Sequence, residues 1–216
     1  MTAGKRTPII VVAALFLVLN ISHLQQRRDA AAQQAGRGAE LRLVQADEKR
    51  IVYPPESLPR LALPGRAPRT VRSLLKVPRQ LQHGEFAWDD LGAAGPIWIR
   101  IDLDRQLVSV FRGQDEIGTA VILYGAPEKP TPKGAFRVIA KATDHYSRSY
   151  DAPMPFMLRL TRDGVAIHAS RVRSDGATHG CLGVPLRFAE KLYAVAGTGT
   201  EVYIIDSPAT GTGKTA

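Results

Sequence analysis

The sequence of 216 residues contains only one cysteine, Cys181. A single cysteine cannot form a disulfide within the chain. Free cysteine usually serves as a small buried apolar residue, but in an oxidising compartment an unpaired thiol is a liability unless its chemistry is used. Composition alone therefore leaves two roles open for Cys181, a structural one and a reactive one.

Long apolar runs are also missing, apart from one near the N-terminus. Residues 8–21 read PIIVVAALFLVLNI, follow Lys5 and Arg6, and are shorter than the roughly 20 residues that a relaxed transmembrane helix prefers. The residues after the run lack the small-x-small pattern of a cleavage site. We therefore expect residues 1–24 to form an uncleaved signal anchor, with a cleaved signal peptide as the alternative.

Aromatic residues make up 6% of the sequence, which limits how its net charge of +9 can be interpreted. The basic residues between positions 60 and 79 are interleaved with prolines and lack the aromatic platform on which nucleic-acid bases stack. We therefore expect no nucleic-acid partner. A solvated linker, or attraction to anionic lipid headgroups or an anionic cell-wall polymer, accounts for the charge.

Proline is abundant in residues 25–95, which we expect to be a basic linker. The first half could form a frayed helix, and the proline-rich half that follows favours an extended spacer that lifts a domain off a membrane. Phe86 and Trp88 indicate that the end of this linker packs on the domain. Residues 208–216 are expected to be a flexible tail.

Residues 96–207 show the short alternating segments of a β domain. The Asp163-Gly164 pair is a hairpin signal because both residue types tolerate positive φ. One helix is expected at 186–196. The predicted fold is mainly β with one or two short helices, with strands at 97–103, 107–111, 116–123, 135–140, 156–160, 165–168 and 201–205.

Cys181 ends the motif THGC, which suggests a nucleophile. A thiol attacks as the thiolate, and a nearby imidazole can remove its proton and later protonate the leaving amine. His168, at the end of an expected strand, and His179 are the candidate bases. The Ala169 carbonyl or the Ser170 hydroxyl is within reach to orient the His168 ring.

Gly180 directly precedes the thiol. Without a Cβ it permits a tight backbone conformation and close approach of a substrate, so that amides near Gly180 and Cys181 can face a developing oxyanion. An ordinary turn glycine is the alternative interpretation.

A metal site is the competing use of these side chains. His145, His168, His179 and Cys181 could converge on zinc, but no second paired motif accompanies them, and a metal would quench the thiolate as a nucleophile. We expect no metal and no cofactor.

Several motifs agree in order and spacing with one known family. His168 is followed at a distance by Thr178-His179-Gly180-Cys181, and upstream motif positions are Gly125, Thr131, Pro132, Gly134 and Phe136. Over about residues 96–206 the sequence resembles the YkuD-type L,D-transpeptidase catalytic domain. The resemblance implies a mixed β-sandwich or barrel-like fold, with His168 as the base and His179 lining the site.

One position departs from the family pattern. Gly183 stands where the family usually places arginine or asparagine, so hydrogen bonds or charge near the site are lost. Some aromatic and apolar residues line a groove or pack in the core: Tyr124, Tyr150, Met154 and Phe156. Thr131 and Pro132 fit a structural turn better than a substrate contact.

The resemblance implies a cell-wall enzyme that faces the periplasm from the inner membrane, or is exported if its signal is cleaved. Cys181 would attack a peptidoglycan stem tetrapeptide, form a thioacyl-enzyme and transfer it to an amine, giving 3-3 crosslinks. The alternatives are an L,D-carboxypeptidase or amidase, an enzyme that tethers a protein to peptidoglycan, and a non-catalytic peptidoglycan-binding module.

Overall fold

The computed structural model describes residues 49–77, 79–90 and 92–207. The expected signal anchor at 1–24, the first half of the expected linker and the expected tail at 208–216 lie outside these ranges. Within the described ranges, no helix has the length and apolar character needed to cross a bilayer.

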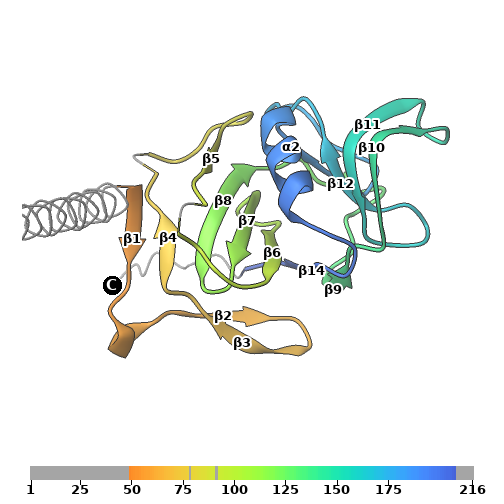
Figure 1. Cartoon of the computed structure of the whole chain (residues 1–216). Helices are drawn as coiled ribbons and strands as arrows, with labels where there is room; N and C mark the ends of the chain where they lie inside the picture. The colour runs from red at the N-terminus through yellow and green to blue at the C-terminus, as the bar shows by residue number, and fades with distance from the viewer. Residues whose placement is uncertain (1–48, 78, 91, 208–216) are drawn as a thin grey trace, which may run out of the picture. The chain divides into compact units, whose positions relative to one another are not determined.

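The larger of the two main sheets has eight strands and contributes most of the core (Figure 1). Its order is β1-β4-β8-β7-β6-β14-β9, and β5 also pairs with β8. Strands β6, β7 and β8 form an antiparallel meander, whereas β14 runs parallel to β6. The bounds are β1 (Arg50–Val52), β4 (Ser73–Leu75), β5 (Phe86–Trp88), β6 (Ile97–Asp102), β7 (Leu107–Arg112), β8 (Asp115–Val121), β9 (Gly134–Arg137) and β14 (Glu201–Ile205).

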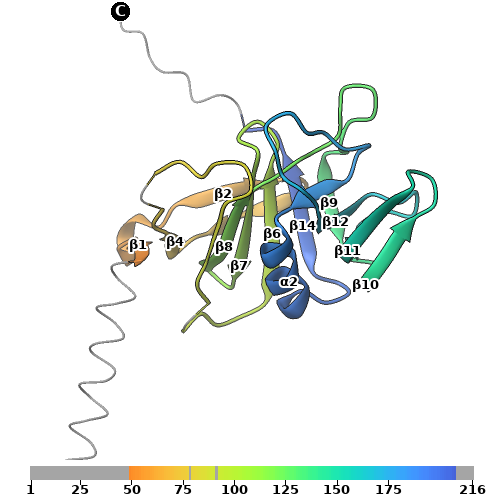
Figure 2. The ribbon, with the colours of Figure 1, turned by 90° about the horizontal axis from the view of Figure 1, so that it is seen from above.

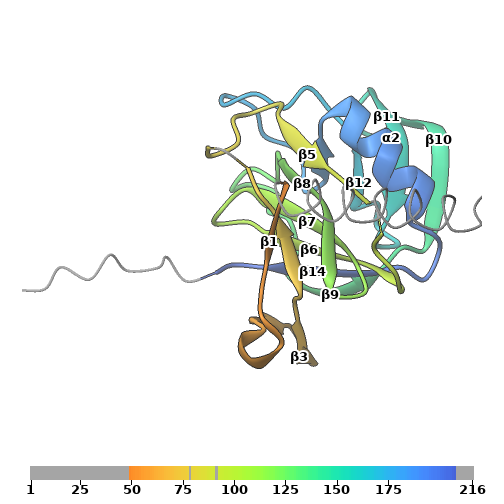
Figure 3. The same ribbon diagram turned by 60° about the vertical axis from the view of Figure 1, so that its left-hand side comes forward.

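A four-stranded sheet carries the chemistry-bearing residues. Its order is β10 (Ala140–Ser147), β11 (Ala152–Arg159), β12 (Ala166–Ala169) and β13 (Leu182–Val184). β10 and β11 form a long antiparallel hairpin, which lies at the opposite end of the described fold from β1 in Figures 1 and 2. The α-helix α2 (Leu186–Val195) follows β13 and packs on β11 and β12 (Figure 3).

Alternating sequence patterns explain why these segments pair. Ile99, Ile101, Val108 and Val110 are fully or almost fully buried in the core that the two sheets and α2 share. The helix contributes Phe188, Ala189 and Leu192, which recur at helical spacing on one face. The predicted fold class, mainly β with a short helix, is confirmed for the described residues.

Most predicted elements are confirmed within a few residues: the strands at 97–103, 107–111, 116–123, 165–168 and 201–205, and the helix at 186–196. The Asp163-Gly164 hairpin is also confirmed, because β11 and β12 pair antiparallel and Gly164 has φ of 109°. The expected strand at 156–160 is the second half of β11. Pro153 and Pro155 at its start are tolerated, because there the strand pairs only with β10 and its other edge is open.

The single strand expected at 135–140 is wrong, because the chain changes sheets there. β9 ends at Arg137 and β10 begins at Ala140. Between them, Val138 donates its N–H to the Thr200 carbonyl at 2.9 Å and Ile139 donates to the Arg159 carbonyl at 2.8 Å. The apolar run therefore serves two sheets in succession.

The linker expected at 25–95 is wrong for the part that the structure describes. From residue 50 the chain forms β1, the 3-10 helix η1 (Pro55–Ser57), β2 (Arg60–Leu63), β3 (Arg66–Thr70), β4 and β5. The described prolines do not prevent this pairing, because they lie at the start of η1, directly before β2, in the turn between β2 and β3, or in β3, which pairs only with β2. The side chains of Phe86 and Trp88 in β5 contact Phe188 edge-on.

A buried arginine joins the N-terminal strands to the large sheet. Arg50 Nε donates to Ser73 Oγ at 3.1 Å, Nη1 to the Asp89 carbonyl at 3.1 Å, and Nη2 to the Glu116 carbonyl. Ser73 Oγ in turn donates to Asp115 at 2.9 Å. β1, β4 and β8 therefore share one polar network, and the compact unit begins at Lys49.

Candidate active site

Two parallel neighbouring strands bring the predicted nucleophile and base together. β12 and β13 pair in a register that sets Ile167 opposite Leu182 and His168 opposite Gly183. Cys181 directly precedes β13, so the loop from Ser170 to Cys181 returns the thiol to the edge at which His168 lies. The parallel pairing of these short strands therefore places Cys181 and His168 on neighbouring strands, which their spacing in the sequence could not predict.

The hydrogen bonds of His168 define its tautomer. The ring is buried, with 9% of the residue exposed. Its Nδ1 lies 2.9 Å from the Ala169 carbonyl oxygen and 3.4 Å from Ser170 Oγ. A carbonyl oxygen can only accept, so Nδ1 carries the proton and Nε2 of the neutral ring keeps its lone pair. Burial also lowers the pKa of His168, which favours the neutral base at pH 7.

Cys181 is half-buried and is held as a thiol at rest. Its Sγ donates to the Gly164 carbonyl at 3.6 Å. Burial raises the pKa of the thiol, against smaller opposing effects of the Ala166 amide and the Lys129 ammonium group. Among the described residues, no hydrogen bond joins this thiol to His168, so a proton transfer between the two would require the sulfur to turn away from Gly164.

Two loops hold the cysteine in place through threonine hydroxyls. Thr178 Oγ1 donates to the Cys181 carbonyl at 2.6 Å. Thr131 Oγ1 accepts the Gly125 N–H at 2.9 Å and donates to the Gly180 carbonyl at 3.1 Å. Thr131 is thus a structural residue that connects the loop after β8 with the cysteine loop.

Glycine is required at one position in each of these two loops. Gly180 has φ of 101°, in the region that L side chains rarely adopt. At Gly125 an added Cβ would lie 2.2 Å from the Lys129 carbonyl oxygen and 2.9 Å from Gly180 Cα. The two loops therefore approach each other more closely than any side chain would allow.

The side chain of Ser170 leaves no room for a side chain at position 183. The backbone N–H and carbonyl of Gly183 both bond to Leu123, at 3.0 and 2.9 Å. A Cβ built at Gly183 would lie 2.8 Å from Ser170 Cβ, 2.9 Å from Ser170 Oγ and 3.3 Å from Leu123 Cβ. Ser170 thus occupies the space that a larger residue at position 183 would need, and its hydroxyl lies 3.4 Å from His168 Nδ1.

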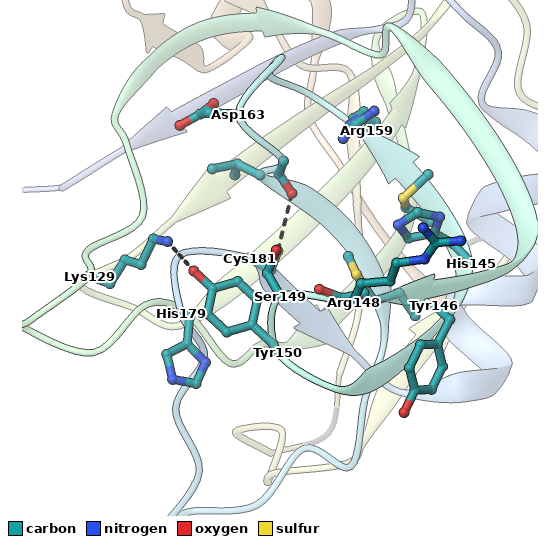
Figure 4. Close-up of a pocket in the computed structure, with 15 residues that line it drawn as sticks. Lys129, His145, Tyr146, Arg148, Ser149, Tyr150, Arg159, Asp163, His179 and Cys181 are labelled. Atoms are coloured by element: carbon teal, nitrogen blue, oxygen red, sulfur yellow. Dashed lines mark hydrogen bonds between the residues drawn. The ribbon is translucent and has the colours of Figure 1, made fainter.

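A cavity of about 520 Å³ opens onto Cys181 beneath the β10–β11 hairpin (Figure 4). His179 lines it and stacks on Tyr150, with ring centroids 4.5 Å apart. The residues that line it are Lys129, His145, Tyr146, Ser147, Arg148, Ser149, Tyr150, Met154, Met157, Arg159, Asp163, Gly164, Val165, His179 and Cys181.

The cavity corrects and extends the set of groove residues proposed from the sequence. Tyr150 and Met154 line it, whereas Tyr124 and Phe156 pack against the main core. Sequence reasoning missed Lys129, which lies two residues before Thr131. Proximity to the thiol could not be inferred from this local pattern.

No group of three or more His, Cys, Asp or Glu side chains among the described residues could hold a metal ion. The arrangement of Cys181 and His168 instead offers a nucleophile and a base, with the Ala169 carbonyl fixing the ring. Such an arrangement can form and resolve a thioester.

Comparison with protein families agrees with this geometry. The family model for the YkuD L,D-transpeptidase catalytic domain matches residues 96–204, which is about half of the chain. The chain therefore belongs to the YkuD L,D-transpeptidase family. The matched region includes His168 and Cys181 and leaves out β1 to β5.

Similar solved structures include L,D-transpeptidases from three bacteria. The Stackebrandtia nassauensis protein is 22% identical, with a TM-score of 0.49 over 55% of this chain and 60% of that chain. An Enterococcus faecium mutant is 23% identical (TM-score 0.47, 52% and 50%), and the Mycobacterium smegmatis protein 21% (TM-score 0.47, 50% and 58%). This chain thus spans 50–60% of the length of these structures. Among curated proteins, none matches it.

Proposed function

We propose that this protein is a cell-wall L,D-transpeptidase in which Cys181 is the nucleophile and His168 the general base. One observation carries the proposal: parallel pairing of β12 with β13 sets the buried His168, whose Nδ1 bonds to the Ala169 carbonyl, on the strand next to the one that follows Cys181, and Cys181 lines a cavity of about 520 Å³. Peptidoglycan stem peptides are the substrate class on which the family acts.

The first half-reaction forms a thioester. Nε2 of His168 takes the thiol proton as Sγ attacks the carbonyl carbon of the amide between the third residue and the terminal D-residue of a stem tetrapeptide. Amides near Gly180 and Cys181 are proposed to stabilise the oxyanion. The C–N bond then breaks, the imidazolium protonates the departing nitrogen, and the D-residue leaves.

The second half-reaction transfers the acyl group. An amine of another stem attacks the thioester carbonyl, and His168 accepts the proton that this amine loses. The C–S bond breaks, the thiolate takes the proton back, and a 3-3 crosslink results. Water in place of the amine would give a carboxypeptidase, and a protein lysine would give a tethered envelope protein.

We further propose that residues 1–24 anchor the protein in the inner membrane with the catalytic domain in the periplasm. The support is the apolar run at 8–21 and the substrate that the family uses. Fractionation with N-terminal sequencing tests this location. A new N-terminus after the apolar run, with the protein in the soluble fraction, would contradict the anchor.

The activity is tested with defined muropeptides and mass spectrometry of the products, using the full chain and its Cys181→Ala variant. Crosslinked dimers from the wild type alone would support transpeptidation. Loss of the terminal D-residue with addition of water would indicate hydrolysis. Unchanged muropeptides with retained binding would indicate a non-catalytic module and overturn the proposal.

A further inference from the structure

The cavity beside Cys181 carries more positive than negative charge. Its lining includes Lys129, Arg148 and Arg159, against the single carboxylate of Asp163. Among the described ion pairs, none involves these three cations. In the view of Figure 4, Lys129 and Arg148 lie on opposite sides of Cys181. The cavity therefore attracts an anion that the described protein does not itself supply.

Lys129 is the cation that the fold places most firmly near the nucleophile. Its N–H donates to the Ala126 carbonyl at 2.9 Å, which closes a turn in the loop after β8. Its carbonyl oxygen and Cγ would lie 3.6 and 3.9 Å from a Cβ at Gly180, the residue before the nucleophile. The stem of Lys129 thus packs on the cysteine loop. Burial raises the pKa of Cys181, and the positive charge of the Lys129 ammonium group offsets a part of that rise.

A tyrosine from the hairpin completes a pair of donors. Tyr150 lies in the turn between β10 and β11, and its hydroxyl oxygen accepts a hydrogen bond from Lys129 Nζ. Nζ is also 4.8 Å from the centroid of the Tyr150 ring, and the same ring stacks on His179. Because the phenol oxygen accepts from Lys129, its own proton remains available. None of the hydrogen bonds between described residues uses that proton, and Tyr150 is 41% exposed.

We propose that Lys129 and Tyr150 form a subsite for a free carboxylate of the stem peptide, next to the amide that Cys181 attacks. An ammonium group and a phenol O–H side by side match the two oxygens of a carboxylate, and charge-assisted hydrogen bonds of this kind are the strong ones. This inference rests on the proposed function. Two carboxylates meet the description: the terminal one of the released D-residue, and the one on the side chain of a diaminopimelate third residue.

The test compares three synthetic stem tetrapeptides on the full chain. One has both carboxylates free, one is amidated at the C-terminus, and one is amidated on the side chain of its third residue. KM is measured for the wild type, Lys129→Gln, Lys129→Arg and Lys133→Gln. Lys133 is a matched control, because it lies in the same loop but pairs with Asp206 and does not line the cavity.

We expect wild-type KM to rise about tenfold for one amidated stem, the loss typical of a hydrogen bond to a charged group. The amidated position that weakens binding identifies the carboxylate. The ratio compares the KM for that amidated stem with the KM for the free stem. In Lys129→Gln this ratio should fall to about one, whereas Lys129→Arg and Lys133→Gln should keep the wild-type ratio. Because the ratio is taken within one variant, an effect of Lys129 on the thiol cancels.

Equal KM values for all three stems in the wild type would overturn the subsite. A KM ratio in Lys129→Gln that is as high as in the wild type would also overturn it. Calorimetry on the Cys181→Ser variant separates this result from a failure of the proposed function. If the wild type makes no product but Cys181→Ser binds the free stem in a Lys129-dependent way, the transpeptidase assignment fails and the subsite stands. If product forms without carboxylate preference, the subsite fails and the enzyme assignment stands.

Discussion

Replacing Gly183 with alanine should damage both stability and catalysis through a contact with Ser170. Gly183 has ordinary extended backbone in β13, so the added methyl group meets only a problem of space. The new Cβ would lie 2.8 Å from Ser170 Cβ and 3.3 Å from Leu123 Cβ. Leu123 is held by two backbone hydrogen bonds to Gly183, so Ser170 is the group that must move.

The expected cost follows from overpacking. Inserting a methyl group into a filled site costs about 1–3 kcal/mol, which for a domain of this size lowers Tm by roughly 2–12 °C. Ser170 Oγ lies 3.4 Å from His168 Nδ1, so its displacement shifts the ring of the base. We expect acylation to slow by up to about 100-fold, the loss that a misplacement of about 1 Å can cause.

Thermal unfolding and intact-mass measurement of Cys181 acylation test this reasoning. Gly197→Ala is the control, because a Cβ there meets nothing within 4 Å. The double variant Ser170→Gly with Gly183→Ala should recover part of the lost stability, with a coupling of at least about 0.5 kcal/mol. If Gly183→Ala behaves like Gly197→Ala, or if the two substitutions simply add, the steric explanation is wrong.

Four further outcomes are expected. Cys181→Ser should lose all turnover with an unchanged Tm, because the hydroxyl stays un-ionised beside the same base; wild-type product would remove the nucleophile assignment. His168→Ala should slow acylation of Cys181 by a carbapenem about 10²–10⁴-fold, read by intact mass, and an unchanged rate would point to another base. Burial lowers the pKa of His168 below its ordinary 6.5, so the rate of acylation of the wild type should begin to fall only when the pH drops below 6.5. A fall of this rate with a midpoint above pH 6.5 would contradict His168 as the base. Arg50→Met should reduce the free energy of unfolding by about 3 kcal/mol or more, measured by denaturant titration against the exposed control Arg60→Met; equal effects would refute the buried network.

Periodicity and motif spacing predicted the domain from residue 97 onward because each signal there is local. Alternating apolar residues define β6 and β7, and Pro185 and Gly197 bracket α2. The candidate site was also predicted from local motifs, since the THGC sequence and the strand-end His168 both lie in continuous stretches.

The errors arose where long-range contacts decide the structure. Residues 50–75 have too many prolines to suggest pairing, yet Arg50 reaches Ser73 and the Glu116 carbonyl and fixes β1 and β4 at the sheet edge. No local pattern reports a partner 66 residues away. Lys129 escaped notice for the same reason, because its place beside Cys181 depends on how two loops meet.

The hydrogen bonds that hold the backbone of Gly180 and Cys181 come from groups that are neither acids nor bases near neutral pH. Backbone amides and carbonyls and the hydroxyls of Thr131 and Thr178 supply the hydrogen bonds that hold Gly180 and the Cys181 carbonyl. None of these groups changes protonation between weakly acidic and weakly alkaline solution. The backbone of Gly180 and Cys181 should therefore keep its position while the pH changes. Proton-dependent changes in rate then report the reacting thiol, the imidazole and the charged groups that meet the substrate, and a kinetic titration becomes a direct measurement of the chemistry.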